Sequence, residues 1–108
     1  MVGTSEEDMA GAVNRVSKLG GGIVLHAGGD MQAELELSIG GFLSRLSIEE
    51  VVKRLNTLQG KAEAMGFRFP DAALALATLT TPAIPFMRIT EDGLMDMKKG
   101  LIVPLIIR

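Results

Sequence analysis

The opening of the fold is decided by residues Val2–Val24, VGTSEEDMAGAVNRVSKLGGGIV. Thr4 and Glu7 have the spacing of a capping box, in which a hydroxyl and a carboxylate bind the free amides at the start of a helix. Apolar residues then recur at helical intervals, at Met9, Ala12, Val13, Val16 and Leu19. The glycines Gly20–Gly22 follow, and glycine accepts the positive φ that a helix exit often needs. The pattern predicts a helix over about Ser5–Leu19 and a strand after it.

A β-hairpin is predicted next. Its first strand is Ile23–Ala27, its turn is Gly28-Gly29-Asp30, and its second strand is Met31–Ile39. The second strand alternates between apolar residues (Met31, Ala33, Leu35, Leu37, Ile39) and polar ones (Gln32, Glu34, Glu36, Ser38). Such alternation indicates one buried and one solvated face, and therefore a sheet that helices cover on one side.

Two more helices follow the hairpin. Ser47 and Glu50 form a second capping box, and the helix after them should run to about Met65. Its apolar stripe consists of Ile48, Val51, Val52, Leu55, Leu58, Ala62 and Met65, and Gly60 inside it suggests close packing. A third, short helix over Asp71–Leu79 is almost wholly apolar, which predicts that it is buried.

The last third of the chain should be mostly strand. Pro82 and Pro85 predict an ordered, irregular loop over Thr80–Phe86. Short strands are expected at Met87–Thr90, Leu94–Met97 and Leu101–Ile107, with a turn at Glu91-Asp92-Gly93. The whole predicts a single α+β domain over residues 1–108: a mostly antiparallel sheet with two long helices and one short helix packed against it.

Composition limits the classes of function. Hydrophobic residues make up 47% of the 108 residues and aromatic residues only 4%, so the core must be aliphatic. A net charge of −2 argues against nucleic acid as a partner, because phosphate binding needs clustered Lys and Arg. The chain has no cysteine, which excludes thiolate metal sites and fits a cytoplasmic protein. The longest apolar stretch, Leu101–Ile107, is too short to cross a bilayer, so no membrane partner is expected.

Several segments carry a family likeness: GGGIV (Gly20–Val24), AELELSIGGFL (Ala33–Leu43), IEEVVKRLNTL (Ile48–Leu58), LALATLTTPAIP (Leu74–Pro85) and ITEDGLMDM (Ile89–Met97). In this order and spacing they resemble the C-terminal domain of bacterial and archaeal adenine deaminases, metal-dependent members of the amidohydrolase superfamily. The resemblance implies a longer parent enzyme that hydrolyses adenine to hypoxanthine and ammonia. It also implies that a divalent metal of the manganese or iron type is bound by a preceding catalytic barrel of the same polypeptide, and that this chain holds no cofactor itself.

Candidate catalytic residues are few. His26 is the only imidazole, and metal-assisted deamination needs several ligands and a group that moves protons; we interpret His26 as a solvated strand residue. Asp92 and Asp96 are better explained by turn formation than by acid–base catalysis. Gly20–Gly22 follows a helix, whereas a phosphate-binding loop precedes one. No catalytic, cofactor-binding or metal-binding residue is therefore predicted in this chain.

The expected role is architectural: packing on the barrel, closing part of the active-site rim, or holding subunits of a homo-oligomer together. If a strand precedes Val2 in the parent, its loss would expose a sheet edge and favour association of the isolated chain. One alternative is a free-standing module that binds a small molecule or oligomerises, with Gly40-Gly41, Phe42 and Leu43 as the first place to look for a ligand. Another is an independent enzyme that uses Asp and Glu residues without a metal.

Overall fold

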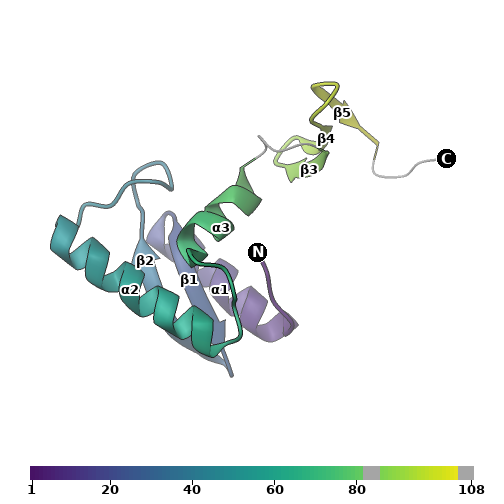
Figure 1. The fold of residues 1–108 in the computed structure, drawn as a ribbon. Helices are drawn as coiled ribbons and strands as arrows, with labels where there is room; N and C mark the ends of the chain where they lie inside the picture. The colour runs from purple at the N-terminus through teal and green to yellow at the C-terminus, as the bar shows by residue number, and fades with distance from the viewer. Residues whose placement is uncertain (82–85, 105–108) are drawn as a thin grey trace. The chain divides into compact units, whose positions relative to one another are not determined.

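The structure, a computed structural model, describes residues 1–81 and 86–104 and contains two compact units, Met1–Ala75 and Leu76–Arg108. The elements in chain order are α1 (Glu6–Leu19), β1 (Gly22–Ala27), β2 (Asp30–Glu36), α2 (Ile48–Ala64), α3 (Ala72–Thr80), β3 (Met87–Thr90), β4 (Gly93–Asp96) and β5 (Leu101–Val103) (Figure 1). The predicted α+β class is confirmed. Among the described residues, the strands form two antiparallel sheets rather than one, with orders β1-β2 and β3-β4-β5. The single domain over 1–108 stays a prediction.

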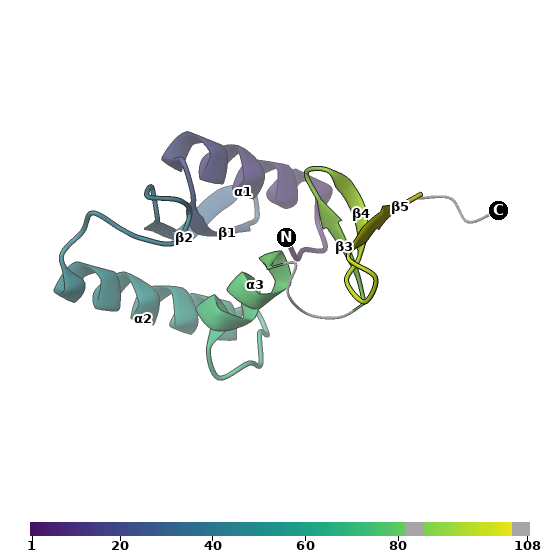
Figure 2. The ribbon, with the colours of Figure 1, turned by 90° about the horizontal axis from the view of Figure 1, so that it is seen from above.

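In the first unit, the β1–β2 hairpin lies between two helices (Figure 2). Cross-strand pairs Ile23–Leu35 and Leu25–Ala33 place apolar side chains on one face, where α2 packs. The opposite face carries Glu34, and α1 covers that face through an ion pair from Arg15. The expectation of helices on one side of the sheet is therefore wrong. A helix can cover a polar face when it supplies the partner for a half-buried carboxylate such as that of Glu34.

The cap of helix α1 lies one residue later than predicted, at Ser5 instead of Thr4. The Ser5 hydroxyl, not that of Thr4, accepts a hydrogen bond from the Asp8 amide at 3.3 Å. Because the helix begins at Glu6, Ser5 is the residue whose side chain reaches the third helical amide. The helix ends as predicted at Gly20, whose φ of 74° is left-handed.

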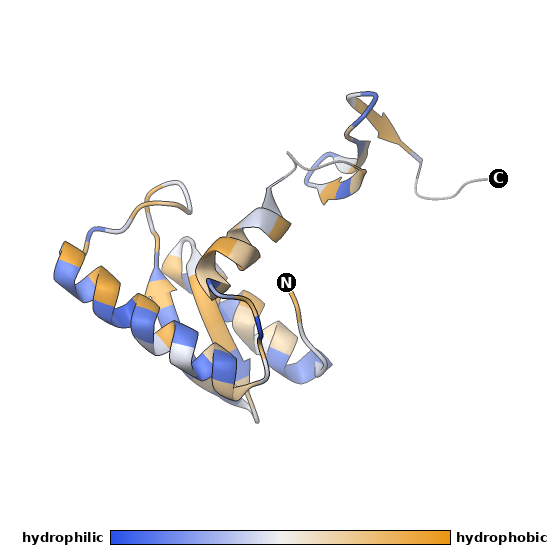
Figure 3. Cartoon of the chain, viewed as in Figure 1, coloured by the Kyte–Doolittle hydropathy of each residue, from blue (hydrophilic) through white to orange (hydrophobic). Residues whose placement is uncertain are grey.

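The core of the first unit is small and aliphatic. Its buried residues are Ala33, Leu35, Leu58, Ala62 and Ala72. The predicted cap of α2 is confirmed, since the Ser47 hydroxyl accepts from the Glu50 amide at 3.3 Å. Only part of the predicted α2 stripe is buried: Leu58 is 1% exposed, whereas Ile48 is 74% exposed. A two-stranded sheet is too small to cover the entire stripe. The side of α2 that is turned to the viewer in Figure 3 is mostly hydrophilic.

Two expectations about close packing are wrong. A Cβ at Gly60 would meet no atom within 4 Å, so this glycine marks no tight contact. In α3 only Ala72 is buried, while Leu74 and Leu79 are exposed. A helix that is apolar around its whole circumference cannot be covered by contact along one side.

In the second unit, β3, β4 and β5 form an antiparallel meander in which Ile89 pairs with Leu94 and Leu94 with Val103. A tight turn at Glu91-Asp92 joins β3 to β4, as predicted. Residues 82–85 of the expected loop and 105–107 of the expected last strand lie outside the described residues. Within the ranges 1–81 and 86–104, we find no helix with the length and apolar character that a membrane span requires.

Candidate functional site

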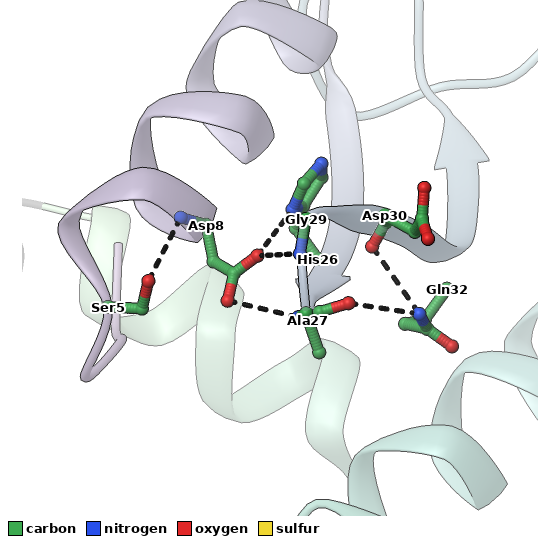
Figure 4. Close-up of polar contacts among 8 residues, drawn as sticks. Ser5, Asp8, His26, Ala27, Gly29, Asp30 and Gln32 are labelled. Carbon is green, nitrogen blue, oxygen red and sulfur yellow. Dashed lines mark hydrogen bonds and ion pairs between the residues drawn. The ribbon is translucent and has the colours of Figure 1, made fainter.

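His26 lies on β1 and faces α1 (Figure 4). Its Nδ1 is 2.9 Å from the Asp8 Oδ1, and its side chain is only 14% exposed. The ring also packs on Gly11 of α1, where an added Cβ would lie 2.7 Å from Cε1 and Nε2. The interpretation of His26 as a solvated residue is therefore wrong, because α1 covers this face of the hairpin.

Asp8 connects the first turn of α1 to the hairpin turn. Besides His26, its Oδ1 accepts the Gly29 amide at 2.9 Å, and its Oδ2 accepts the Gly28 amide at 3.1 Å. These amide hydrogen bonds, that from Gly29 above all, and the bond from His26 lower the pKa of Asp8 below its usual 3.8. We call Asp8, His26, Gly28 and Gly29 the Asp8 cluster.

Sequence reasoning did not identify Asp8 as a partner of His26, because the two residues are 18 positions apart. The position of His26 in its strand nevertheless carried some information, because successive side chains of a strand point to opposite faces. That alternation places His26 on the face opposite Leu25, away from the apolar core. Asp8 stood out only as one of three acidic residues in the first turn of α1.

The Asp8 cluster does not fit a catalytic metal. A catalytic metal site needs at least three protein ligands and an open position. In this cluster only Asp8 and His26 have side chains that could bind a metal, and these two side chains contact each other. No group of three or more His, Cys, Asp or Glu side chains that could hold a metal ion occurs in the part of the chain that the structure describes. The geometry of the cluster is that of a clamp between a helix and a hairpin.

A second polar connection joins α1 to β2. Arg15 donates from Nε and a terminal nitrogen to the two carboxylate oxygens of Glu34, at 2.7 and 2.8 Å. This two-point hydrogen bond from Arg15 lowers the pKa of Glu34, and the same contact raises the pKa of Arg15. With the Asp8 cluster, it fixes α1 at two points on the polar face of the hairpin.

The other candidate carboxylates shape a turn. Asp96, at the end of β4, is 9% exposed, and its Oδ1 accepts the backbone amides of Lys98 and Lys99 at 3.0 and 3.2 Å. Asp92 is exposed in the turn between β3 and β4. The structure thus gives Asp96 the conformational role that the sequence favoured.

A pocket of about 270 Å³ lies between α2 and the start of α3. Two of its polar side chains are already engaged in holding the backbone. Gln59 accepts the Ala72 amide at 2.8 Å, and Asp71 accepts the Leu74 amide at 2.8 Å. The loop that the sequence suggested as a ligand site, Gly40–Leu43, does not enclose its apolar side chains, since Phe42 is 74% exposed and Leu43 is 63% exposed.

Comparison with known proteins gives a consistent result. Residues 1–100 match the family described as the adenine deaminase C-terminal domain. The chain is 42% identical over 104 residues to "Adenine deaminase" of Methylobacterium sp. (strain 4-46), covering 96% of this chain and 18% of that protein. It is 39% identical over 107 residues to "Adenine deaminase" of Kosmotoga olearia, covering 99% of this chain and again 18% of the relative. The chain spans less than a fifth of the length of these curated relatives. By the family match and its extent, the chain belongs to the adenine deaminase C-terminal domain family.

Proposed function

We propose that this chain is the non-catalytic C-terminal part of an adenine deaminase and that it packs on the catalytic part of the same polypeptide. One observation carries the proposal: nearly the whole chain matches only 18% of the length of proteins named adenine deaminase. The engagement of its only histidine in the Asp8 cluster supports it further.

The parent reaction is hydrolysis of adenine to hypoxanthine and ammonia. This chemistry needs several metal ligands and proton-transferring side chains. We assign these residues, and the divalent manganese or iron that they bind, to the preceding catalytic barrel. The residues of the present chain then contribute packing on the barrel or contacts between subunits of a homo-oligomer. The absence of cysteine fits a cytoplasmic place for the enzyme. Because adenine and hypoxanthine are purines, the proposed reaction is a step of purine metabolism.

The first test uses the purified chain alone. We expect no release of ammonia from adenine with Mn²⁺ or Fe²⁺ present. The positive control is the full-length Methylobacterium enzyme under the same conditions. Ammonia release that grows in proportion to the amount of this chain, and that persists through further purification, would overturn the non-catalytic assignment.

The second test asks whether the chain packs on the catalytic part. The Methylobacterium enzyme is made without its 104-residue matching segment, and in a second version this chain replaces that segment. We expect the truncated enzyme to unfold at lower temperature than the full-length one, and the replacement to restore part of the difference. Equal melting temperatures for the truncated and the replaced protein would contradict packing.

A further inference from the structure

The β3–β5 sheet has one face that is almost entirely apolar. In an antiparallel sheet, paired residues share a face, and the pairs here are Met87–Asp96–Leu101 and Ile89–Leu94–Val103. The apolar members of this set are Met87, Ile89, Leu94, Leu101 and Val103. We call these five residues the β3–β5 apolar face. The hydrophobic character of β5 is visible in Figure 3.

The single charged residue on this side does not make the face polar. The Asp96 carboxylate is turned toward the backbone amides of Lys98 and Lys99, and Asp96 is only 9% exposed. Its charge is thus satisfied within the turn that follows β4. The remaining surface is made of aliphatic side chains.

Three of the five residues of the β3–β5 apolar face are exposed to solvent, and Leu94 and Val103 are half-buried. Ile89 is 84% exposed, Leu101 59% and Met87 48%. All the buried hydrophobic residues of the described chain lie between Ala33 and Ala72. A small sheet needs a covered hydrophobic face for stability, and a contiguous exposed apolar patch marks an interaction site.

We propose that the β3–β5 apolar face is the surface that docks on the catalytic part of the same adenine deaminase polypeptide. This inference rests on the proposed function and adds to it the surface that makes the contact. More than four-fifths of each of the two relatives lies outside the segment that this chain matches. A covalently joined partner acts at an effective concentration in the millimolar range, roughly, which favours it over a second copy in dilute solution.

The opposite face of the same sheet supplies a matched control. It carries Arg88, Thr90, Met95 and Ile102, so it is mixed in polarity. Ile102 is 53% exposed and lies on β5, next to Leu101 of the apolar face. Ile89→Lys and Ile102→Lys therefore introduce the same charge in place of the same exposed residue type, on opposite faces of one sheet.

The experiment measures amide hydrogen exchange in the free chain and in the chain joined to the rest of the Methylobacterium enzyme. We expect the amides of β3–β5 to exchange about tenfold or more slowly in the joined protein than in the free chain. Ile89→Lys should abolish this slowing, whereas Ile102→Lys should keep most of it. In the free chain, exchange of the β3–β5 amides of each variant that equals that of the unmodified chain shows that the substitution leaves the sheet as it was. The rest of the Kosmotoga enzyme serves as a second host.

The outcomes separate the two proposals. If joining slows exchange in neither unit, the packing role in the proposed function fails. If joining slows exchange only in α1–α2, the chain packs on the catalytic part through another surface, and only this inference is overturned. Slow exchange of β3–β5 already in the free chain would also overturn it. In that case, exchange rates that depend on protein concentration would show that a second copy covers the face. Exchange rates that do not depend on it would show that another part of the same chain covers the face.

Discussion

Asp8 makes more polar contacts than the sequence around it predicted. Its contribution to the stability of the fold should depend on pH. Its pKa is lowered in the folded state by the amides of Gly29 and Gly28 and by His26. A carboxyl with a lowered folded pKa stabilises the fold fully above its unfolded pKa, here near 3.8, and loses that contribution as pH falls through the folded pKa. Asp8→Asn should therefore lower the free energy of unfolding at about pH 7 and make little difference at about pH 2.

Urea denaturation of both proteins across this pH range measures the effect. Asp30→Asn is the control, because Asp30 directly follows the same hairpin turn but its carboxylate makes none of the hydrogen bonds seen at Asp8. At about pH 7 the control should match the unmodified chain more closely than Asp8→Asn does. A difference between Asp8→Asn and the unmodified chain that stays constant with pH would contradict the role given to the ionised carboxylate.

Two helical glycines give a paired prediction of opposite sign. At Gly60 a Cβ meets nothing within 4 Å, so Gly60→Ala should stabilise α2 by about 1 kcal/mol through helix propensity. At Gly11 a Cβ would lie 2.7 Å from the His26 ring, which Asp8 holds in place. Gly11→Ala should therefore destabilise the first unit by about 1–3 kcal/mol. Thermal unfolding followed by circular dichroism checks both, and stabilisation by both substitutions would show that the His26 ring moves freely.

At the scale of elements, the start of α1 offers a direct comparison of two neighbouring hydroxyls. Ser5→Ala removes the hydroxyl that accepts the Asp8 amide and should cost about 1 kcal/mol. Thr4→Ala removes an exposed hydroxyl outside the cap and should change stability by less than about 0.5 kcal/mol. Unfolding free energies of the two variants decide between them, and a larger loss for Thr4→Ala would restore the cap that the sequence suggested.

The elements themselves could be predicted because their signals are local. The alternation that predicted β2, the Gly28-Gly29 turn and the Ser47 cap each depend on residues a few positions apart, although β2 ends at Glu36 and not at Ile39 as predicted. Two features of the packing could not be predicted. The cover of the polar face by α1 depends on Arg15 meeting Glu34, and the contact of His26 depends on Asp8. Both pairs are separated by about one helix and a turn, and helical periodicity gives no information on such distant pairing.

The apolar stripe of α2 shows what helical periodicity can and cannot predict about burial. The spacing of Ile48, Leu58 and Ala62 fixed a common face of the helix, and the structure buries the last two. Periodicity states which residues share a face but not how large the covering surface is. The exposure of Ile48 could therefore not be predicted. Ile48 lies on the predicted stripe but is not covered in the first unit.

For the whole molecule, the exposed apolar residues predict association of the isolated chain. They occur in both units, at Phe42 and Leu43 after β2 and at Ile89 and Leu101 on the β3–β5 apolar face. Large exposed apolar patches favour self-association in water. Sedimentation velocity of the free chain should therefore show a mean mass that rises with concentration. Ile89→Lys and Phe42→Lys should each reduce the rise, and the double variant should reduce it more than either.

The same measurement on the joined protein distinguishes the two surfaces. If the catalytic part covers the β3–β5 apolar face, Ile89→Lys should no longer reduce association in the joined protein, because in the unmodified joined protein this face is already covered. Phe42→Lys should keep its effect unless the loop after β2 is covered as well. A free chain that sediments as a monomer up to roughly millimolar concentration would contradict the prediction, since an open face of Met87, Ile89 and Leu101 should bring copies together at that concentration.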